Sequence, residues 1–219
     1  MHMDNQQMVE SESARQNCYQ AFARCYHLPT QSLKKDLQVL QKDLGRTGSE
    51  ALPYLNDMIL EMKQIPLDVL SVDFTRLFVG PYSLPAPPYG SVYLENERKV
   101  MGDSTMTVLR FYRRFGLDIA EGLKEVPDHI TIELEFMYFL IYKEIESILS
   151  NDLESSQLYI KEQLSFLADH LDVWAPQFTG NIIEFSGTEF YRNLGKATRL
   201  FIKEDCLYLN NVCKKAALK

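Results

Sequence analysis

Apolar residues recur at helical spacing along most of this chain. In the first half they follow one another at intervals of three and four residues, the period that gathers side chains on one face of an α-helix. The segments with this period are Ala14–Cys25, Gln31–Leu44, Glu50–Ile65 and Leu67–Phe78. Proline lacks the amide that a helix needs, and glycine disfavours the helical interior. We therefore expect Pro29, Gly45 and Pro66 to end the first three helices.

The second half shows the same period. Its segments begin after a cap at Asp103 or Ser104, at Asp128, at Asp152 and near Phe190. Between Leu134 and Tyr142 only Glu135 is polar. A helix that is apolar nearly all round is surrounded by others, so we place this one at the centre of the fold, with Asp128 as its N-cap. We expect Trp174 and Pro176 to end the helix that starts at Asp152.

These patterns predict an all-α protein. No strand pair with a tight turn and no repeat of solenoid length is found in the 219 residues, so we expect a helical bundle of about ten helices. The apolar pattern lapses over residues 118–128, where loop-forming residues gather. The chain is therefore expected to form one helical domain over 1–219, with subdomains at approximately 10–118 and 128–213.

A proline-rich loop interrupts the helices. The stretch from Gly80 to Gly90 reads GPYSLPAPPYG and holds four prolines. Each proline fixes its backbone φ angle and removes a donor, which excludes both a helix and a central strand. The sequence predicts a rigid, extended loop that carries aromatic side chains.

Composition and charge narrow the function classes. Apolar residues make up 46% and charged residues 24%, and 30 acidic against 23 basic residues leave a formal charge of -7, so a nucleic-acid partner is not expected. A cationic partner suits this charge better. We find neither a secretory signal nor the ~18 consecutive apolar residues of a membrane span. We expect a cytoplasmic protein without stable membrane insertion.

No catalytic or metal motif stands out. Phosphate-binding, dinucleotide-binding, zinc-protease and nucleophile-elbow patterns are absent from the sequence, and the four histidines lack metal-ligand spacing. Cys18/Cys25 and Cys206/Cys213 are each seven residues apart, which on a helix is about 10.5 Å and too far for a disulfide. We expect buried free thiols, no metal and no cofactor.

Two polar pairs have alternative interpretations. The Asp128-His129 pair is typical of a helix cap, although a carboxylate beside an imidazole can also tune a histidine for proton transfer. Arg113-Arg114 is followed by Phe115 as in an export signal, but no hydrophobic region follows. We interpret the arginine pair as a solvated helix face.

Three segments resemble the TorD-type redox-enzyme maturation chaperones, a family that includes the dimethyl sulfoxide reductase chaperones. The first is DFTRLFVGP from Asp73 with PPYGSVYLE from Pro87, which departs from the family pattern at Gly90, where an acid is frequent. The second and most specific is PDHITIELEFM from Pro127. The third is FLADHLDVWAPQF from Phe166, with FYRNLGKAT from Phe190.

The resemblance implies a chaperone that is not an enzyme. Family members bind the twin-arginine signal peptide of a molybdenum-cofactor oxidoreductase and its apo form until cofactor insertion and export, as monomers or exchanged homodimers. A receptor for such a peptide needs carboxylates for two guanidinium groups beside an apolar groove. We expect the acidic and polar part to contain Asp128, His129, Glu95 and Asp103. We expect the apolar part to contain Phe78, Leu84, Pro88 and Tyr89.

Two other functions remain open from the residues alone. The chain could be a small helical hydrolase that uses His129 with Asp128, although the sequence offers no nucleophile for it. It could also be a helical protein-interaction scaffold with a partner unrelated to export. Leu77, Leu134 and Phe136 are expected in the core under every interpretation.

Overall fold

The computed structural model describes residues 5–81, 83–95, 100–118 and 126–217. Over these ranges it contains α-helices, two π-helical turns and no strand, which confirms the predicted all-α class. The helices are α1 Asn5–Cys25, α2 Leu33–Thr47, α3 Leu52–Met62, α4 Leu67–Phe74, α5 Gly90–Leu94, α6 Asp103–Arg114, α7 Ile130–Leu149, α8 Leu153–Phe166, α9 Asp172–Phe185 and α10 Glu189–Ala217. The π-helical turns are η1 Thr75–Val79, which continues α4, and η2 Leu167–Leu171, which joins α8 to α9.

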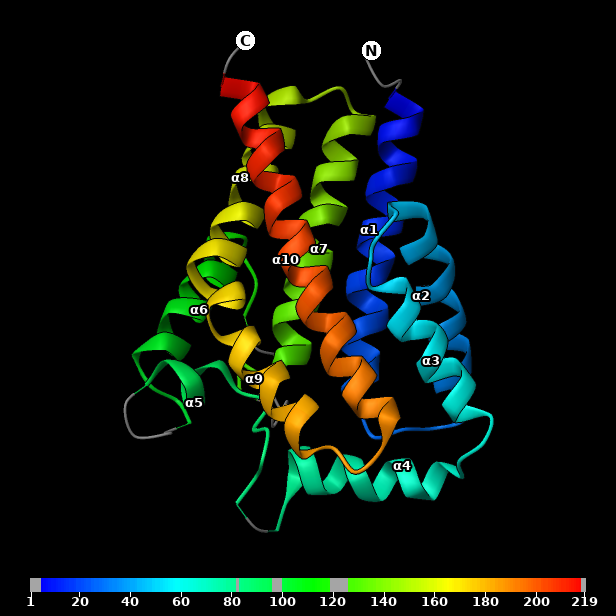
Figure 1. Ribbon diagram of the computed structural model, residues 1–219. Coiled ribbons are helices and arrows are strands. Elements are labelled where there is room, and N and C mark those ends of the chain that lie inside the picture. The colour runs from blue at the N-terminus through cyan, green and yellow to red at the C-terminus, as the bar shows by residue number, and fades with distance from the viewer. Residues whose placement is uncertain (1–4, 82, 96–99, 119–125, 218–219) are drawn as a thin grey trace.

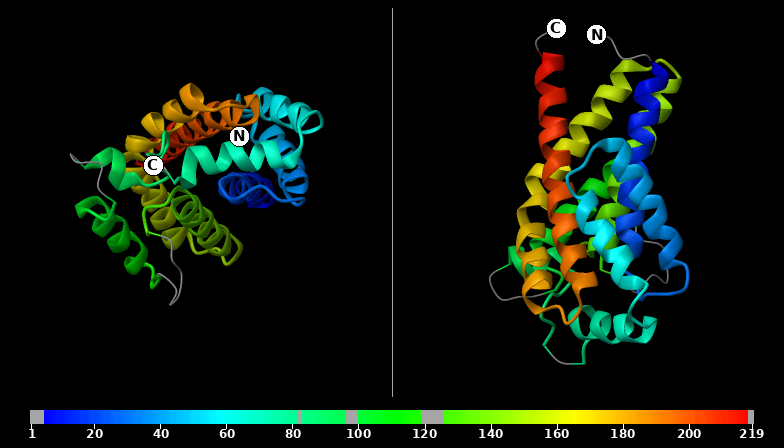
Figure 2. Two further views of the ribbon diagram at one scale, coloured as in Figure 1. Left: turned by 90° about the horizontal axis from the view of Figure 1, so that it is seen from below. Right: turned by 45° about the vertical axis from the view of Figure 1, so that its right-hand side comes forward.

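Three long helices, α1, α7 and α10, run along the molecule, and both chain ends lie at the same end of it (Figure 1, Figure 2). The short helix α4 lies across the other end. Helix α1 packs against α7, and α10 packs against α3 as well as α9. Helices from the two halves of the chain are thus in direct contact. The predicted joint at 118–128 falls mainly on residues 119–125, which lie outside the described ranges.

The core contains the apolar residues that the helical pattern predicted. Leu77, Leu134 and Phe136 are at most 3% exposed, as expected. Helix α7 is not surrounded on all sides, because Glu135 and Tyr142 on its outer face are exposed. The expectation of a fully central helix is therefore wrong for that face, where polar and aromatic residues take the surface positions.

Two predicted helix ends are also wrong. Gly45 lies inside α2, and the helix ends at Gly48, whose positive φ of 70° lets its amide bond back to the Leu44 carbonyl oxygen. That left-handed conformation is available to glycine at little cost, and it is what terminates the helix. Trp174 and Pro176 lie inside α9. The chain passes through η2 just before them, so the proline falls near the start of the new helix.

The four cysteines are free thiols. Cys18 and Cys25 are buried, whereas Cys206 and Cys213 are half-buried, which corrects the expectation of burial for the second pair. In the part of the chain that the structure describes, no three His, Cys, Asp or Glu residues are placed to hold a metal ion. No helix in that same part is long and apolar enough to cross a membrane.

Candidate functional site

The proline loop and the PDH segment meet in the folded protein. Tyr89 and His129 form an isolated antiparallel bridge. On either side of it, the Gly90 amide donates to the Asp128 carbonyl oxygen and the Ile130 amide donates to the Pro88 carbonyl oxygen, both at 2.9 Å. The fold thus brings together Asp128, His129, Pro88 and Tyr89, four of the predicted site residues.

Asp128 fixes the start of α5 and does not cap α7. Its carboxylate is fully buried, and its Oδ2 atom accepts a 2.6 Å hydrogen bond from the Ser91 amide. Its Oδ1 atom is buried without a hydrogen-bond partner in the described ranges. The expected N-cap role is wrong because the side chain turns away from its own helix toward a segment 37 residues earlier. The Asp128 carboxylate thus ties the start of α5 to the PDH segment.

His129 takes the capping role on α7. Its Nδ1 atom accepts from the Thr131 amide at 3.2 Å and lies 2.6 Å from the Thr131 hydroxyl, while its ring meets that of Tyr89 at 5.2 Å. Burial, with a smaller contribution from His27, lowers the pKa of His129 to about 4. The ring is therefore neutral near pH 7. Because the Asp128 carboxylate is bonded to Ser91 instead of this ring, the pair is not arranged as a catalytic dyad.

A second buried acid lies under α5. Glu133 is fully buried and is held by Nε2 of His170 at 2.6 Å and by Nε1 of Trp174 at 3.0 Å. Burial raises the pKa of Glu133. Burial lowers the pKa of His170, but the adjacent Glu133 carboxylate outweighs it and leaves that pKa raised. Both shifts favour the protonated form of the side chain concerned.

Gly90 fits against this pair because it has no side chain. A Cβ atom at position 90 would lie 3.1 Å from Trp174 Nε1 and 3.3 Å from Glu133 Oε1. The acid that the resembling family often carries at this position would therefore meet the Glu133 carboxylate.

The other predicted site residues lie in three places. Phe78 is 5% exposed and packs on Tyr26 and Phe178 in the core. Leu84 is half-buried in the loop. Glu95 accepts from the amide and hydroxyl of Ser104 at the start of α6, and these hydrogen bonds lower its pKa. Asp103 is exposed in the first turn of α6. The structure does not gather these four around the Asp128-His129 pair.

An apolar groove, here called the valine groove, runs beside α4 and the start of the proline loop. It has a volume of about 620 Å³ and is lined by Val72, Pro81 and Pro85, with Asp68 and Arg76 as its charged residues. Val72 is 69% exposed, an unusual position for a large apolar side chain on a short helix. The groove offers an apolar surface beside the Asp68 carboxylate and the Arg76 guanidinium.

A second groove, here called the amide groove, shares the loop with the first. It has a volume of about 430 Å³ and is lined by Leu84, Tyr93, Gln177 and Asn181 among others. Ser83 and Pro85 line both grooves, so the rigid loop separates them. Gln177 and Asn181 are four residues apart on α9 and present amide groups on the same face.

Sequence reasoning missed Asp68, Val72 and Asn181 as groove residues. One signal for the valine groove was present, because Val69 and Val72 fall outside the stripe of Leu67, Leu70 and Phe74 that faces the core. A helix with apolar residues beyond its buried stripe indicates a second contact surface. The amide groove had no such signal, because it depends on the packing of α9 beside a loop about 95 residues earlier in the chain.

Asp73 of the first motif segment has a structural role. Its buried carboxylate accepts hydrogen bonds from the Gly187 amide at 3.0 Å and from the Thr188 amide at 2.9 Å, at the start of α10. Arg76 donates to the same carboxylate at 2.6 Å and also to the Phe185 carbonyl oxygen. Asp73 and Arg76 thus link the helix beside the valine groove to the start of α10.

Replacing Asp73 with alanine should lower the free energy of unfolding by about 2 kcal/mol, because the cap is lost and the buried Thr188 amide is left unpaired. Urea denaturation measures the change. Asp68→Ala, an exposed carboxylate on the same helix, is the control and should change stability by less than about 0.5 kcal/mol. Equal losses of stability in the two variants would contradict the role of Asp73 as a cap of α10.

A buried charge network lies far from the loop, between α1, α7 and α10. Arg15 is 5% exposed and bonds to Glu12, Glu144 and Asp205. Burial lowers the pKa of Arg15, but the three carboxylates outweigh it and raise that pKa above its usual value. Burial, followed by the nearby Glu12, raises the pKa of Glu144 to about 7.

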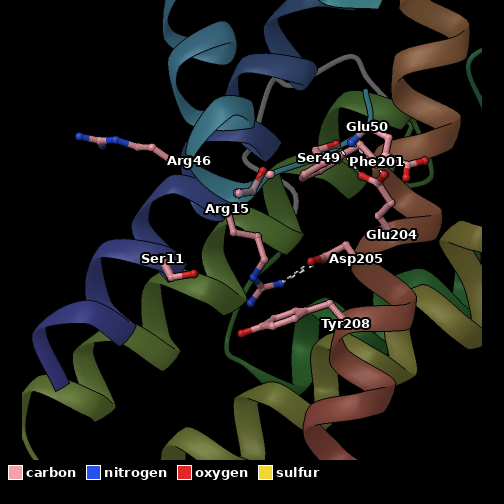
Figure 3. A pocket seen from close by; sticks show the side chains of 11 residues that line it. Ser11, Arg15, Arg46, Ser49, Glu50, Phe201, Glu204, Asp205 and Tyr208 are labelled. Carbon is pink, nitrogen blue, oxygen red and sulfur yellow. Dashed lines mark hydrogen bonds and ion pairs between the residues drawn. The ribbon is translucent and has the colours of Figure 1, made fainter. Parts of the chain in front are cut away.

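Figure 3 shows the pocket of about 370 Å³ that this network borders, with Arg15 directed at Asp205 and Arg46 pointing away. Several polar groups of its walls bond to other residues of the protein. The Ser49 hydroxyl donates to Glu204, and the Tyr208 hydroxyl donates to Glu12. We interpret this pocket as part of the structural network and not as the candidate site.

Stability should fall as pH rises through 7. The folded-state pKa of Glu144 lies above its value in an unfolded chain. The contribution of Glu144 to stability is therefore fully present below about pH 4.5 and is lost as the pH rises through about 7. We expect a loss on the order of 2 kcal/mol between pH 5 and pH 8. Chemical denaturation across this range measures it. Glu144→Gln should flatten the profile, and an unchanged slope in that variant would assign the effect to other groups.

Comparison with known proteins identifies the relatives of this chain. It is 35% identical over 129 residues to the Tat proofreading chaperone DmsD of Salmonella typhi, a match that covers 59% of this chain and 56% of that protein. It is 27% identical over 140 residues to the chaperone protein TorD of Vibrio parahaemolyticus, with 64% of each chain covered. The chain thus matches a little over half of the length of the DmsD relative.

A solved structure supports the same relationship. A protein from Archaeoglobus fulgidus, described as a candidate redox enzyme maturation protein, superimposes with a TM-score of 0.53 at 25% sequence identity. The match covers 86% of this chain and 93% of the other. The family model described as nitrate reductase delta subunit matches residues 41–180, which include the proline loop, the PDH segment, the valine groove and all of the amide groove except Asn181 and Phe185. The chain belongs to this family, and the resemblance to the TorD-type chaperones is confirmed.

Proposed function

We propose that this protein is a cytoplasmic chaperone that binds the twin-arginine leader and the apo form of a molybdenum-cofactor oxidoreductase, and holds the precursor until cofactor insertion and export. Its family and the chaperone names of its relatives support this proposal. The observation that carries it furthest is the pair of grooves on either side of a rigid loop that the PDH segment holds in place.

The grooves match the chemistry of a leader peptide. Such a peptide joins two guanidinium groups to an apolar helix. The valine groove offers a large exposed apolar wall and the Asp68 carboxylate, and the amide groove offers the carbonyl groups of Gln177 and Asn181. The prolines hold the loop in one shape before binding, which lowers the entropy lost on recognition.

Asp128 and His129 take part from behind the loop. They are at most 9% exposed, so in this conformation their role is to position the segment that carries Leu84, Pro88 and Tyr89. Glu95 bonds to Ser104 and so holds the start of α6. Asp103, next to Ser104, is an exposed carboxylate in the same turn. The leader would contact the exposed walls of the two grooves. The buried Asp128 and His129 would hold the loop between those walls in place.

The test is recovery of the protein from its own host under anaerobic growth. We expect a molybdoenzyme precursor with an intact leader to co-purify. Val72→Glu, which places a charge in the valine groove, should reduce the recovered precursor by at least about tenfold. Val173→Glu is the control, because Val173 is 54% exposed and lies outside both grooves. The absence of any such precursor, or equal losses in both variants, would contradict the proposal.

A further inference from the structure

A third groove lies between α2, α3 and the start of α4, and it differs from the other two in charge. It has a volume of about 510 Å³. Its floor contains Leu37 and Leu70, which are at most 1% exposed, and its walls include the half-buried Ile59 and Met62. An apolar floor within a polar rim is the arrangement found where a helix binds in a groove. We call it the lysine groove after the charged residues of its rim.

Among the residues that the structure describes, the charged ones that line this groove are positive. Its charged residues are Lys34 and Lys63, and both are exposed. Within the described part of the chain, neither lysine forms an ion pair or a hydrogen bond through its side chain. The other polar residues of the rim are the glutamines at 31, 38 and 41, which are neutral. A chain with a net charge of -7 thus presents a locally basic rim.

One acid on each of the three neighbouring helices has its carboxylate engaged elsewhere. The Asp36 carboxylate of α2 pairs with Arg24 at 2.9 Å. The Glu61 carboxylate of α3 accepts from the Glu189 amide at the start of α10. Asp68 of α4 lines the valine groove, on a different face of its helix. The two lysines therefore remain available to an anionic partner.

The positions of the valine and lysine grooves on α4 indicate different occupants. Asp68, Ser71 and Val72 line the first, whereas Leu67 and Leu70 line the second. Helix α4 lies across one end of the molecule, with α2 and α3 beside its N-terminal end (Figure 1). A cationic leader would be repelled by the two lysines, and an acidic segment would be attracted to them. The lysine groove therefore does not fit the peptide for which the valine groove is proposed.

We propose that the lysine groove binds an acidic amphipathic helix of a partner protein. The apolar face of that helix lies on Leu37, Leu70 and Ile59, through residues spaced at i, i+3, i+4 and i+7. Its acidic residues pair with Lys34 and Lys63 at the rim. This binding is independent of leader binding, because the two grooves use different residues of α4.

The test uses two labelled helical peptides, roughly 18 residues or five turns long. They share the same leucine face and carry either glutamate or lysine on the other face. Fluorescence anisotropy measures their affinity for the intact protein. We expect the glutamate peptide to bind at least about tenfold more tightly than the lysine peptide, and the difference to shrink between about 50 and about 300 mM salt.

Two double variants separate the groove from general charge attraction. Lys34→Glu with Lys63→Glu should weaken binding of the glutamate peptide by at least about tenfold. Lys35→Glu with Lys42→Glu makes the same change in net charge at exposed residues of α2 outside the groove, and it should alter affinity by less than about twofold. Equal effects of the two double variants, or similar affinity for both peptides, would overturn the inference.

A competition experiment distinguishes this inference from the proposed function. An unlabelled twin-arginine leader should leave the glutamate peptide bound. Displacement would show that the two ligands share one site, which would overturn the lysine groove while the proposed function stands. If the leader fails to bind at all but the glutamate peptide binds as expected, the proposed function fails and the inference stands.

Discussion

Replacing Arg15 with methionine should remove a large part of the stability of the protein at neutral pH. The substitution keeps a similar side-chain volume and removes the cation that pairs with the buried Glu12, Glu144 and Asp205 carboxylates. Breaking a buried pair from one side leaves charges without compensation and typically costs about 3–5 kcal/mol. A protein has only about 5–15 kcal/mol of stability in total. Urea denaturation at pH 7.5 measures the loss.

Acid should partly restore the Arg15→Met variant. Burial already raises the pKa of Glu144 and of Asp205, and removal of the arginine raises both further. A raised folded-state pKa means that stability is gained as pH falls. We expect the variant to gain more stability than the unsubstituted protein when the pH falls from 8 to 5.5. Arg46→Met is the control, because the Arg46 side chain is 57% exposed. Equal stability of the Arg15 variant at both pH values would contradict the charge account.

An aspartate at position 90 should also destabilise the protein strongly. The new side chain would enter the space beside Trp174 and Glu133. Overpacking of this kind costs about 1–3 kcal/mol. The added carboxylate would also lie next to the buried Glu133, and one of the two acids would have to hold a proton. We expect a total loss of about 3–4 kcal/mol for Gly90→Asp.

Two further variants separate size from charge at this position. Gly90→Asn has nearly the same shape without the charge, so it should show only the overpacking part of the loss. Adding Glu133→Gln to Gly90→Asp should recover the remaining part, as measured in a double-mutant cycle by chemical denaturation. If Gly90→Asp and Gly90→Asn are equally unstable at pH 8, the like-charge explanation is wrong.

The sequence predicted most of the fold because the fold depends on local periodicity. The stripes that contain Leu77, Leu134 and Phe136 place these residues in the core, as the structure shows. Helix ends were less predictable where two similar residues compete. By residue type either Gly45 or Gly48 could end α2, and only the backbone conformation reveals that Gly48 does so. The extension of α9 through Pro176 likewise depends on the π-helical turn before it.

The site was less predictable because its contacts join distant parts of the chain. The motifs identified Asp128 and Asp73, but not that each carboxylate holds the start of another helix, α5 or α10. The buried Arg15 had a signal, because it is aligned with Cys18 and Phe22 on the apolar face of α1. Its three acidic partners come from α1, α7 and α10, and no local pattern indicates that they converge.

The central claim is that this protein recognises twin-arginine leaders, and its most direct test is a calorimetric titration with two leader peptides. One peptide carries the arginine pair and the other carries lysines in its place, with every other residue the same. Lysine keeps the charge but cannot form the bidentate pair with a carboxylate. We expect the arginine peptide to bind at least about tenfold more tightly. Equal affinity for the two peptides, or no binding of either, would contradict the claim.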